Sequence, residues 1–109
     1  MSDRYVAKPG GVIEVEPDLL RWAEWYEESA AKSLDDGGRR VDRTELADGV
    51  CVSTVFLSLD HAFGQGPPVL FETMIFGGPH DEYQERYTTF EEAREGHRRA
   101  VELAKGGGT

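Results

Sequence analysis

Apolar residues recur at helical spacing near both ends of the chain, which predicts two amphipathic helices. The first covers residues 17–33, where Pro17 suits a first helical turn. Its apolar positions, spaced by three and four, are Leu19, Trp22, Ala23, Tyr26 and Ala30. The second covers residues 88–105, where Thr89 and Glu92 form a capping-box pattern. One helix is therefore expected on each side of a central segment.

The central segment switches to an alternating pattern that predicts a β-hairpin over residues 39–60. Asp48-Gly49 is a strong two-residue turn signal, and that turn would place Thr44 opposite Ser53. One face would then be the core. It carries Leu46, Cys51, Val55, Leu57 and Leu59. The other face is half apolar, so a helix or a second subunit should cover it. It carries Val41, Val52, Thr54 and Phe56.

Shorter patterns complete the prediction. Residues 12–15, 69–76 and 85–89 favour further strands, and the glycines and prolines of residues 60–68 favour a loop. The fold class is therefore α+β, with an antiparallel three- to four-stranded sheet flanked by an N-terminal and a C-terminal helix. We expect one domain over residues 12–105, with flexible tails at 1–11 and 106–109.

Charge narrows the range of partners. The 109 residues carry a formal net charge of −9, which repels phosphate backbones and anionic lipid. No apolar run approaches the ~20 residues that a membrane span needs. We therefore expect no nucleic-acid partner, no membrane partner and a cytoplasmic location, since the N-terminus also lacks the apolar stretch of a signal peptide.

Glu72 is the most informative candidate residue, because it falls within a strand on the same side as Met74 and Phe76. A carboxylate at such a position is costly to bury unless it is paired or protonated. The structural interpretation is a cross-strand pair with Arg86 or exposure on an open sheet face. The functional interpretation is a catalytic carboxylate.

Asp60 and His61 open the glycine-rich loop at the end of a strand, where functional residues often collect. The simpler interpretation is that Asp60 caps the loop by accepting backbone N–H groups. His97 lies on the predicted buried side of the second helix, where a core role is favoured over a ligand role. His61, His80 and His97 show no metal-binding spacing, so we expect neither a metal nor a cofactor.

Trp22, Trp25 and Tyr26 gather on the first helix. Large aromatic residues are enriched at protein interfaces, which makes the three candidate anchors for a partner. The alternative is that both indoles cover the sheet.

One block of the sequence resembles a group of small uncharacterised proteins of tailed bacteriophages and prophages, especially those of actinobacteria. The block runs from "VSTVFLSLDH" through "FGQGPP" and "FETMIFGG" to "RYTT" and "GH", within residues 52–97. The resemblance implies a phage origin and the cytoplasm of the host cell, and it implies no activity. It places Asp60, His61, Glu72 and His97 within one pattern.

These observations favour a non-enzymatic phage accessory protein that binds a protein or a small molecule. The expected contact residues are Trp22, Trp25, Tyr26, Asp60, His61, Phe63, Glu72 and Arg86. A homodimer through the half-apolar sheet face is one way of covering that face. The first alternative is a small hydrolase or nucleotide-processing enzyme that uses Asp60, His61, Glu72 and His97, with or without a metal. The second alternative is a virion or assembly component.

Overall fold

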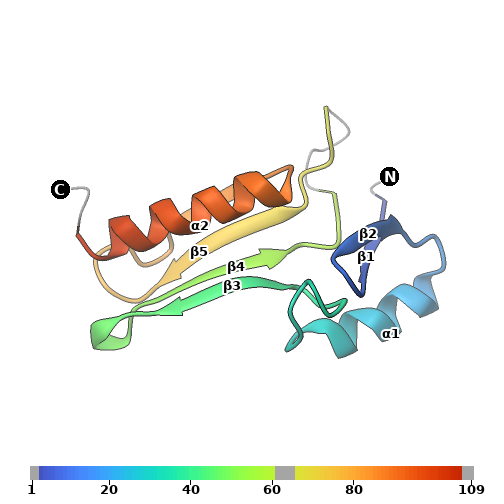
Figure 1. The fold of residues 1–109 in the computed structure, drawn as a ribbon, viewed down its shortest axis with the longest axis horizontal. Coiled ribbons are helices and arrows are strands. Elements are labelled where there is room, and N and C mark those ends of the chain that lie inside the picture. Colours follow the sequence, from blue (N-terminus) through green and yellow to red (C-terminus); the bar gives the residue numbers. More distant parts are fainter. Residues whose placement is uncertain (1–2, 61–65, 107–109) are drawn as a thin grey trace.

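The computed structural model of the chain describes residues 3–60 and 66–106. It confirms the α+β class, with two antiparallel sheets and two helices (Figure 1). The elements are β1 (Tyr5–Lys8), β2 (Val12–Val15), α1 (Leu19–Ser29), β3 (Arg40–Glu45), the short helix η1 (Ala47–Gly49), β4 (Cys51–Phe56), β5 (Phe71–Phe76), β6 (Gln84–Tyr87) and α2 (Phe90–Ala104). The larger sheet has the order β3-β4-β5-β6, so each strand pairs with its neighbour in the sequence.

α2 lies along one face of the four-stranded sheet (Figure 1). The predicted capping box starts this helix: the Thr89 hydroxyl accepts the Glu92 N–H, and the Glu92 carboxylate accepts the Thr89 N–H. Small residues on the inner side of α2 let it approach the strands closely. The buried positions of α2 are Ala93, Gly96, His97 and Ala100. They face Val52, Thr54 and Phe56 of β4 and Phe71, Thr73 and Ile75 of β5.

The predicted hairpin turn is confirmed, but the predicted register is wrong by one residue. Asp48 and Gly49 both have positive φ, and the Val50 N–H donates to the Ala47 carbonyl. The Leu46 N–H also donates to the Val50 carbonyl, so two residues on one side oppose a single residue on the other. Thr44 consequently pairs with Val52 and not with Ser53.

The assignment of the core face was also wrong. α2 covers the face that carries Val52, Thr54 and Phe56, so no second subunit is needed to cover it. Cys51 and Val55 lie on the opposite face. Thr54 made the true core face look too polar in the sequence, because its hydroxyl group is satisfied inside the protein by contacts that only the fold creates.

The N-terminal segment is a structured hairpin from Tyr5 onward, so the predicted tail over residues 1–11 is wrong there. β1 pairs with β2 in antiparallel fashion, and Val6 and Ala7 are buried. Gly10 and Gly11 have positive φ and form the turn of this hairpin.

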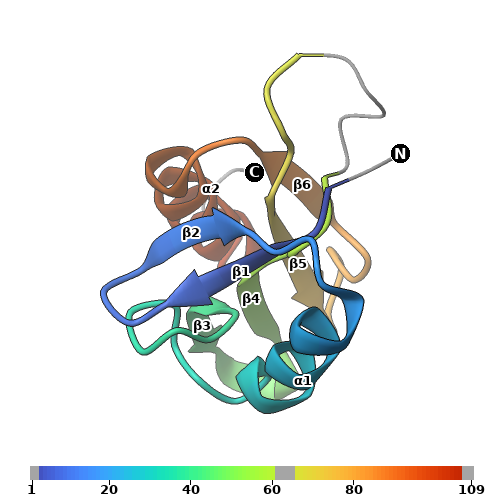
Figure 2. The same ribbon diagram turned by 90° about the vertical axis from the view of Figure 1, so that its right-hand side faces the viewer.

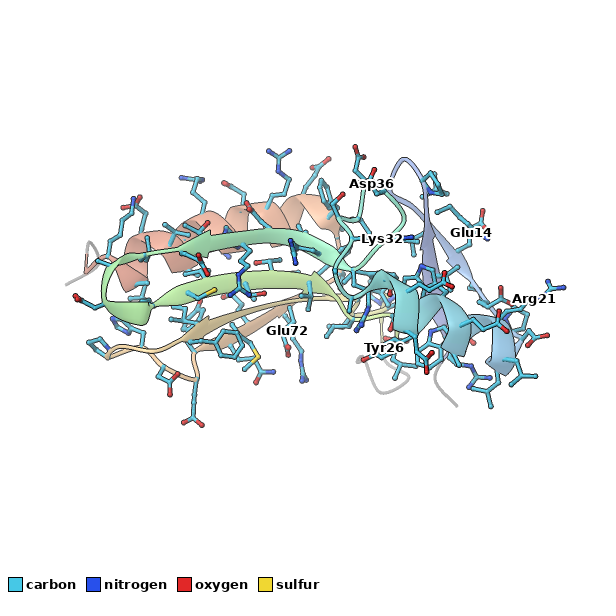
Figure 3. The ribbon with its side chains drawn as sticks, turned by 90° about the horizontal axis from the view of Figure 1, so that it is seen from below. Glu14, Arg21, Tyr26, Lys32, Asp36 and Glu72 are labelled. Carbon is cyan, nitrogen blue, oxygen red and sulfur yellow. The ribbon has the colours of Figure 1, made fainter. Side chains whose placement is uncertain are left out.

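α1 packs against β1 beyond the end of the four-stranded sheet and does not lie on the second face of that sheet (Figure 1). Figure 2 shows the molecule from that end, with α1 and the β1–β2 hairpin toward the viewer. Within residues 3–60 and 66–106, that second face is not covered by a helix. Figure 3 shows it from below, with α2 behind the strands and α1 to one side. We call it the open face.

Gly96 sets how closely α2 approaches the sheet, which gives a prediction. A Cβ at this position would lie 1.9 Å from the Tyr87 hydroxyl oxygen and 2.1 Å from the ring carbon that bears it. Alanine normally stabilises a helix interior by roughly 0.5–1 kcal/mol relative to glycine, but overpacking costs roughly 1–3 kcal/mol. We expect Gly96→Ala to lower the free energy of unfolding in urea denaturation.

The matched control is Glu102→Ala, which lies on an exposed part of the same helix and should leave stability nearly unchanged. If Gly96→Ala instead raised the free energy of unfolding, the close contact between α2 and Tyr87 would be wrong.

Candidate functional site

The open face is the surface on which the predicted residue Glu72 lies. Outside the bulge at Arg40 and Asp42, the strand registers place ten side chains on this face. They are Arg43, Glu45, Cys51, Ser53, Val55, Glu72, Met74, Phe76, Gln84 and Arg86. The prediction that Glu72, Met74 and Phe76 share one side of a strand is therefore confirmed.

The cross-strand pair of Glu72 and Arg86 is confirmed. The two residues lie opposite each other on β5 and β6, and Arg86 Nε lies 2.9 Å from Glu72 Oε2. Gln84 donates its side-chain amide to the same carboxylate oxygen. The Glu72 side chain is only 11% exposed, so these two donors offset much of the cost of burying its charge.

An apolar strip runs across the open face between two ion pairs. Phe76 is 47% exposed, and Val55 and Met74 are partly exposed. Arg43 and Glu45 pair at 3.3 Å on the β3 side, and Glu72 and Arg86 pair on the β6 side. The charges of these two pairs therefore cancel, although the whole chain is strongly acidic.

His97 lies on the covered face and makes the contacts of a core histidine, as the sequence favoured. Its Nδ1 lies 2.7 Å from the Thr54 hydroxyl, and its Nε2 lies 2.9 Å from the Thr44 hydroxyl. Thr54 also bonds Thr73, and the Asp42 carboxylate lies 3.7 Å from His97 Nε2. Both ring nitrogens are thus engaged between α2 and three strands.

The residues proposed for catalysis do not form one site. Thr73, which belongs to the His97 network, directly follows Glu72 in β5, and neighbouring residues of a strand point to opposite faces. Glu72 and His97 are consequently separated by the sheet. Asp60 Oδ1 accepts the Val69 N–H at 2.9 Å, which confirms its role as a loop cap. His61 and Phe63 lie outside the described residues.

The two tryptophans of α1 attach that helix to β1. Trp22 Nε1 donates to the Tyr5 carbonyl at 3.2 Å. Trp25 Nε1 donates to the Ala7 and Gly37 carbonyls, at 3.1 and 2.8 Å. The Trp25 ring also meets Phe56 edge-on, with centroids 5.9 Å apart. These contacts support the interpretation that both indoles pack within the fold and are not anchors for a partner.

The Tyr26 side chain makes more contacts within the fold than its position on α1 suggested. Its ring stacks on Trp22, with centroids 4.9 Å apart, and the Arg39 guanidinium lies 3.7 Å from its centroid. Both contacts stabilise the ring within the fold. Phe76, which the sequence did not single out as a contact residue, is a more exposed aromatic side chain than Tyr26.

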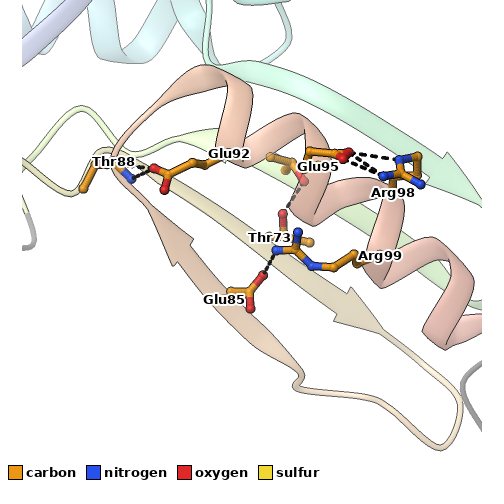
Figure 4. Close-up of polar contacts among 8 residues, drawn as sticks. Thr73, Glu85, Thr88, Glu92, Glu95, Arg98 and Arg99 are labelled. Carbon is orange, nitrogen blue, oxygen red and sulfur yellow. Dashed lines mark hydrogen bonds and ion pairs between the residues drawn. The ribbon is translucent and has the colours of Figure 1, made fainter.

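Concave features also occur away from the apolar strip of the open face. A cavity of about 280 Å³ beside the β1–β2 turn has Leu34, Arg40 and Phe90 among its lining residues, and it contains none of the predicted site residues. A groove of about 490 Å³ runs between β6 and the first turns of α2 (Figure 4). Carboxylates dominate its lining, which comprises Glu85, Arg86, Tyr87, Glu91, Glu92, Glu95 and Arg99.

Within the described ranges, no three His, Cys, Asp or Glu side chains are placed to hold a metal ion together. No helix in that part of the chain is long and apolar enough to span a bilayer.

No family model, no curated protein and no solved structure matches this chain. The geometry of the described surfaces is therefore the basis for a functional proposal.

The buried position of His97 predicts how stability depends on pH. Burial lowers the pKa of His97 below its usual value of 6.5, and the Asp42 carboxylate partly opposes this effect. The folded state therefore favours the neutral ring. The resulting stabilisation is complete above about pH 6.5 and is lost as the pH falls through the lower pKa of the folded state.

Urea denaturation between about pH 7.5 and pH 5 checks this expectation. The wild-type protein should lose stability on acidification, whereas His97→Gln should be less stable at neutral pH and change less over the same range. Parallel losses in both proteins would contradict a role for His97.

Proposed function

We propose that this chain is a small binding protein without catalytic chemistry, and that it holds a protein partner on its open face. The observation that carries the proposal is that α2 covers only one side of the sheet, while Phe76 is 47% exposed on the other. A partly exposed aromatic residue beside further apolar side chains is a typical anchor at an interface.

Charge supports a protein as the occupant of this face. The chain carries a net charge of −9, yet the two ion pairs that flank the apolar strip are each neutral. A protein surface with an apolar patch can thus cover Val55, Met74 and Phe76 without meeting unpaired charge. Polar groups at its rim would meet Arg43 and Arg86, as in ordinary interfaces with an apolar centre and a polar rim.

The resemblance to phage proteins, on residues 52–97, supports a setting for this activity. We propose that the chain is a phage accessory protein and that it acts in the cytoplasm of the infected bacterium. Its partner would then be a protein of the host or of the phage. Binding that occupies a surface requires no catalytic group, which agrees with the separation of Glu72 from His97 by the sheet.

Replacement of the exposed aromatic anchor tests this proposal. In affinity capture from an actinobacterial lysate, quantified by mass spectrometry, Phe76→Ser should lose a protein that the wild type retains. Removing such an anchor typically weakens an interface by about 2 kcal/mol or more, a roughly thirtyfold change in affinity.

Leu20→Ser is the matched control, because Leu20 is 74% exposed on α1, away from the open face. This variant should retain the partner. A captured set that is the same for wild type and Phe76→Ser would show that the open face is not the contact surface.

A further inference from the structure

We infer that the outer edge of β6, together with the acidic groove beneath α2, accepts an extended basic segment of a partner protein as an added strand. This inference rests on the proposed binding function and gives the partner a chemistry. Two independent features of the edge support it: backbone groups that face outward, and a row of carboxylates beside them.

The backbone of β6 is free on its outer side. The Ile75 N–H donates to the Tyr83 carbonyl, so the alternation of an antiparallel pair directs Tyr83, Glu85 and Tyr87 toward β5. The N–H and C=O groups of Gln84 and Arg86 consequently point away from the sheet. No backbone or side-chain partner for these four groups occurs among the described residues. An exposed edge of this kind can pair with another strand.

The opposite edge of the sheet is shielded over part of its length, which favours β6. On β3, the backbone of Arg40 bonds Lys32 and Leu34 of the preceding loop. The Arg43 N–H, which would otherwise face outward, donates to the Asp42 carboxylate at 2.8 Å. Natural sheets commonly block an edge by such local means.

The side-chain chemistry beside β6 favours a basic occupant. Four glutamates and two arginines line the groove. Arg99 pairs with Glu85 at 2.8 Å, and Arg86 turns to the open face to meet Glu72. Glu91 has no ion-pair partner in the described chain and remains available for a cation.

The carboxylates in the groove are ionised at neutral pH. The hydrogen bond from Arg99 lowers the pKa of Glu85, and the Thr88 hydroxyl lowers that of Glu92. The Arg98 guanidinium likewise lowers the pKa of Glu95. Arginine side chains already neutralise Glu85 and Glu95, so a lysine or arginine side chain that enters the groove meets Glu91 and Glu92, for which the described chain supplies no ion-pair partner.

Strand pairing determines which side chains of the bound segment point into the groove. In an antiparallel pair, residues that bond each other lie directly opposite and point to the same face, so the residues of an antiparallel occupant that bond Gln84 and Arg86 direct their side chains toward the open face. The alternate partner residues then point into the groove. The occupant is therefore an extended segment with lysine or arginine at every second position.

A capped seven-residue peptide that alternates lysine and threonine is a suitable probe. Titrated into the isotope-labelled full chain, it should shift the amide signals of Gln84, Arg86 and the first half of α2. N-methylation of the threonine residues should abolish binding, because their N–H groups would face β6. N-methylation of the lysine residues should preserve it. Equal effects of the two methylated peptides, or no binding by the unmodified peptide, would overturn the inference.

The contribution of the groove is measured with charge-matched variants. Glu91→Gln/Glu95→Gln should weaken binding of the peptide about tenfold, as expected for two exposed ion pairs. Glu27→Gln/Glu28→Gln makes the same change in net charge on the exposed side of α1 and should have little effect. Equal weakening by both variants would mean that overall charge attracts the peptide, which contradicts a specific groove.

The outcomes separate this inference from the broader proposal. If the peptide does not bind while Phe76→Ser loses its captured partner, the strand-addition inference is wrong and the open-face proposal stands. If the peptide binds as expected while Phe76→Ser captures the same proteins as the wild type, the contact lies at β6 and not on the open face.

Discussion

The close contact of α2 with one face of the sheet is the constraint on which the rest of the structure depends. Gly96 permits this contact, since a single extra carbon there would overlap Tyr87. His97 then links the helix to Thr54 and Thr44 through both ring nitrogens. Because α2 takes one face and α1 lies beyond the end of the sheet, the other face and the β6 edge remain accessible.

Both long helices and the strands of the larger sheet could be predicted from the sequence, because their signals are local, whereas β1 lay in a segment predicted as a tail. The capping box at Thr89 and the Asp48-Gly49 turn each depend on a few adjacent residues, and both occur in the structure. The pair of Glu72 and Arg86 was also foreseeable, since a buried strand carboxylate needs a cation and Arg86 lay in the next strand.

The choice of the buried face could not be predicted, because it depends on contacts between distant segments. The observed register differs from the predicted one because the Leu46 N–H donates to the Val50 carbonyl, and nothing in the neighbouring residues indicates this bond. Thr54 and Thr73 belong to the core because His97 approaches them from another element. The polar side chains of Thr54 and Thr73 thus made the buried face look exposed in the sequence, although their hydroxyl groups are hydrogen-bonded in the fold.

The two edges of the sheet are unequal, and this limits what the molecule can build. A chain with two receptive edges can pair repeatedly and grow into a filament. Here the β3 edge is blocked in part by the loop at Arg40 and by the Asp42 carboxylate, while the β6 edge is not. Two copies of the chain therefore cannot pair β3 with β6 along the full length of both strands, which disfavours repeated edge-to-edge growth.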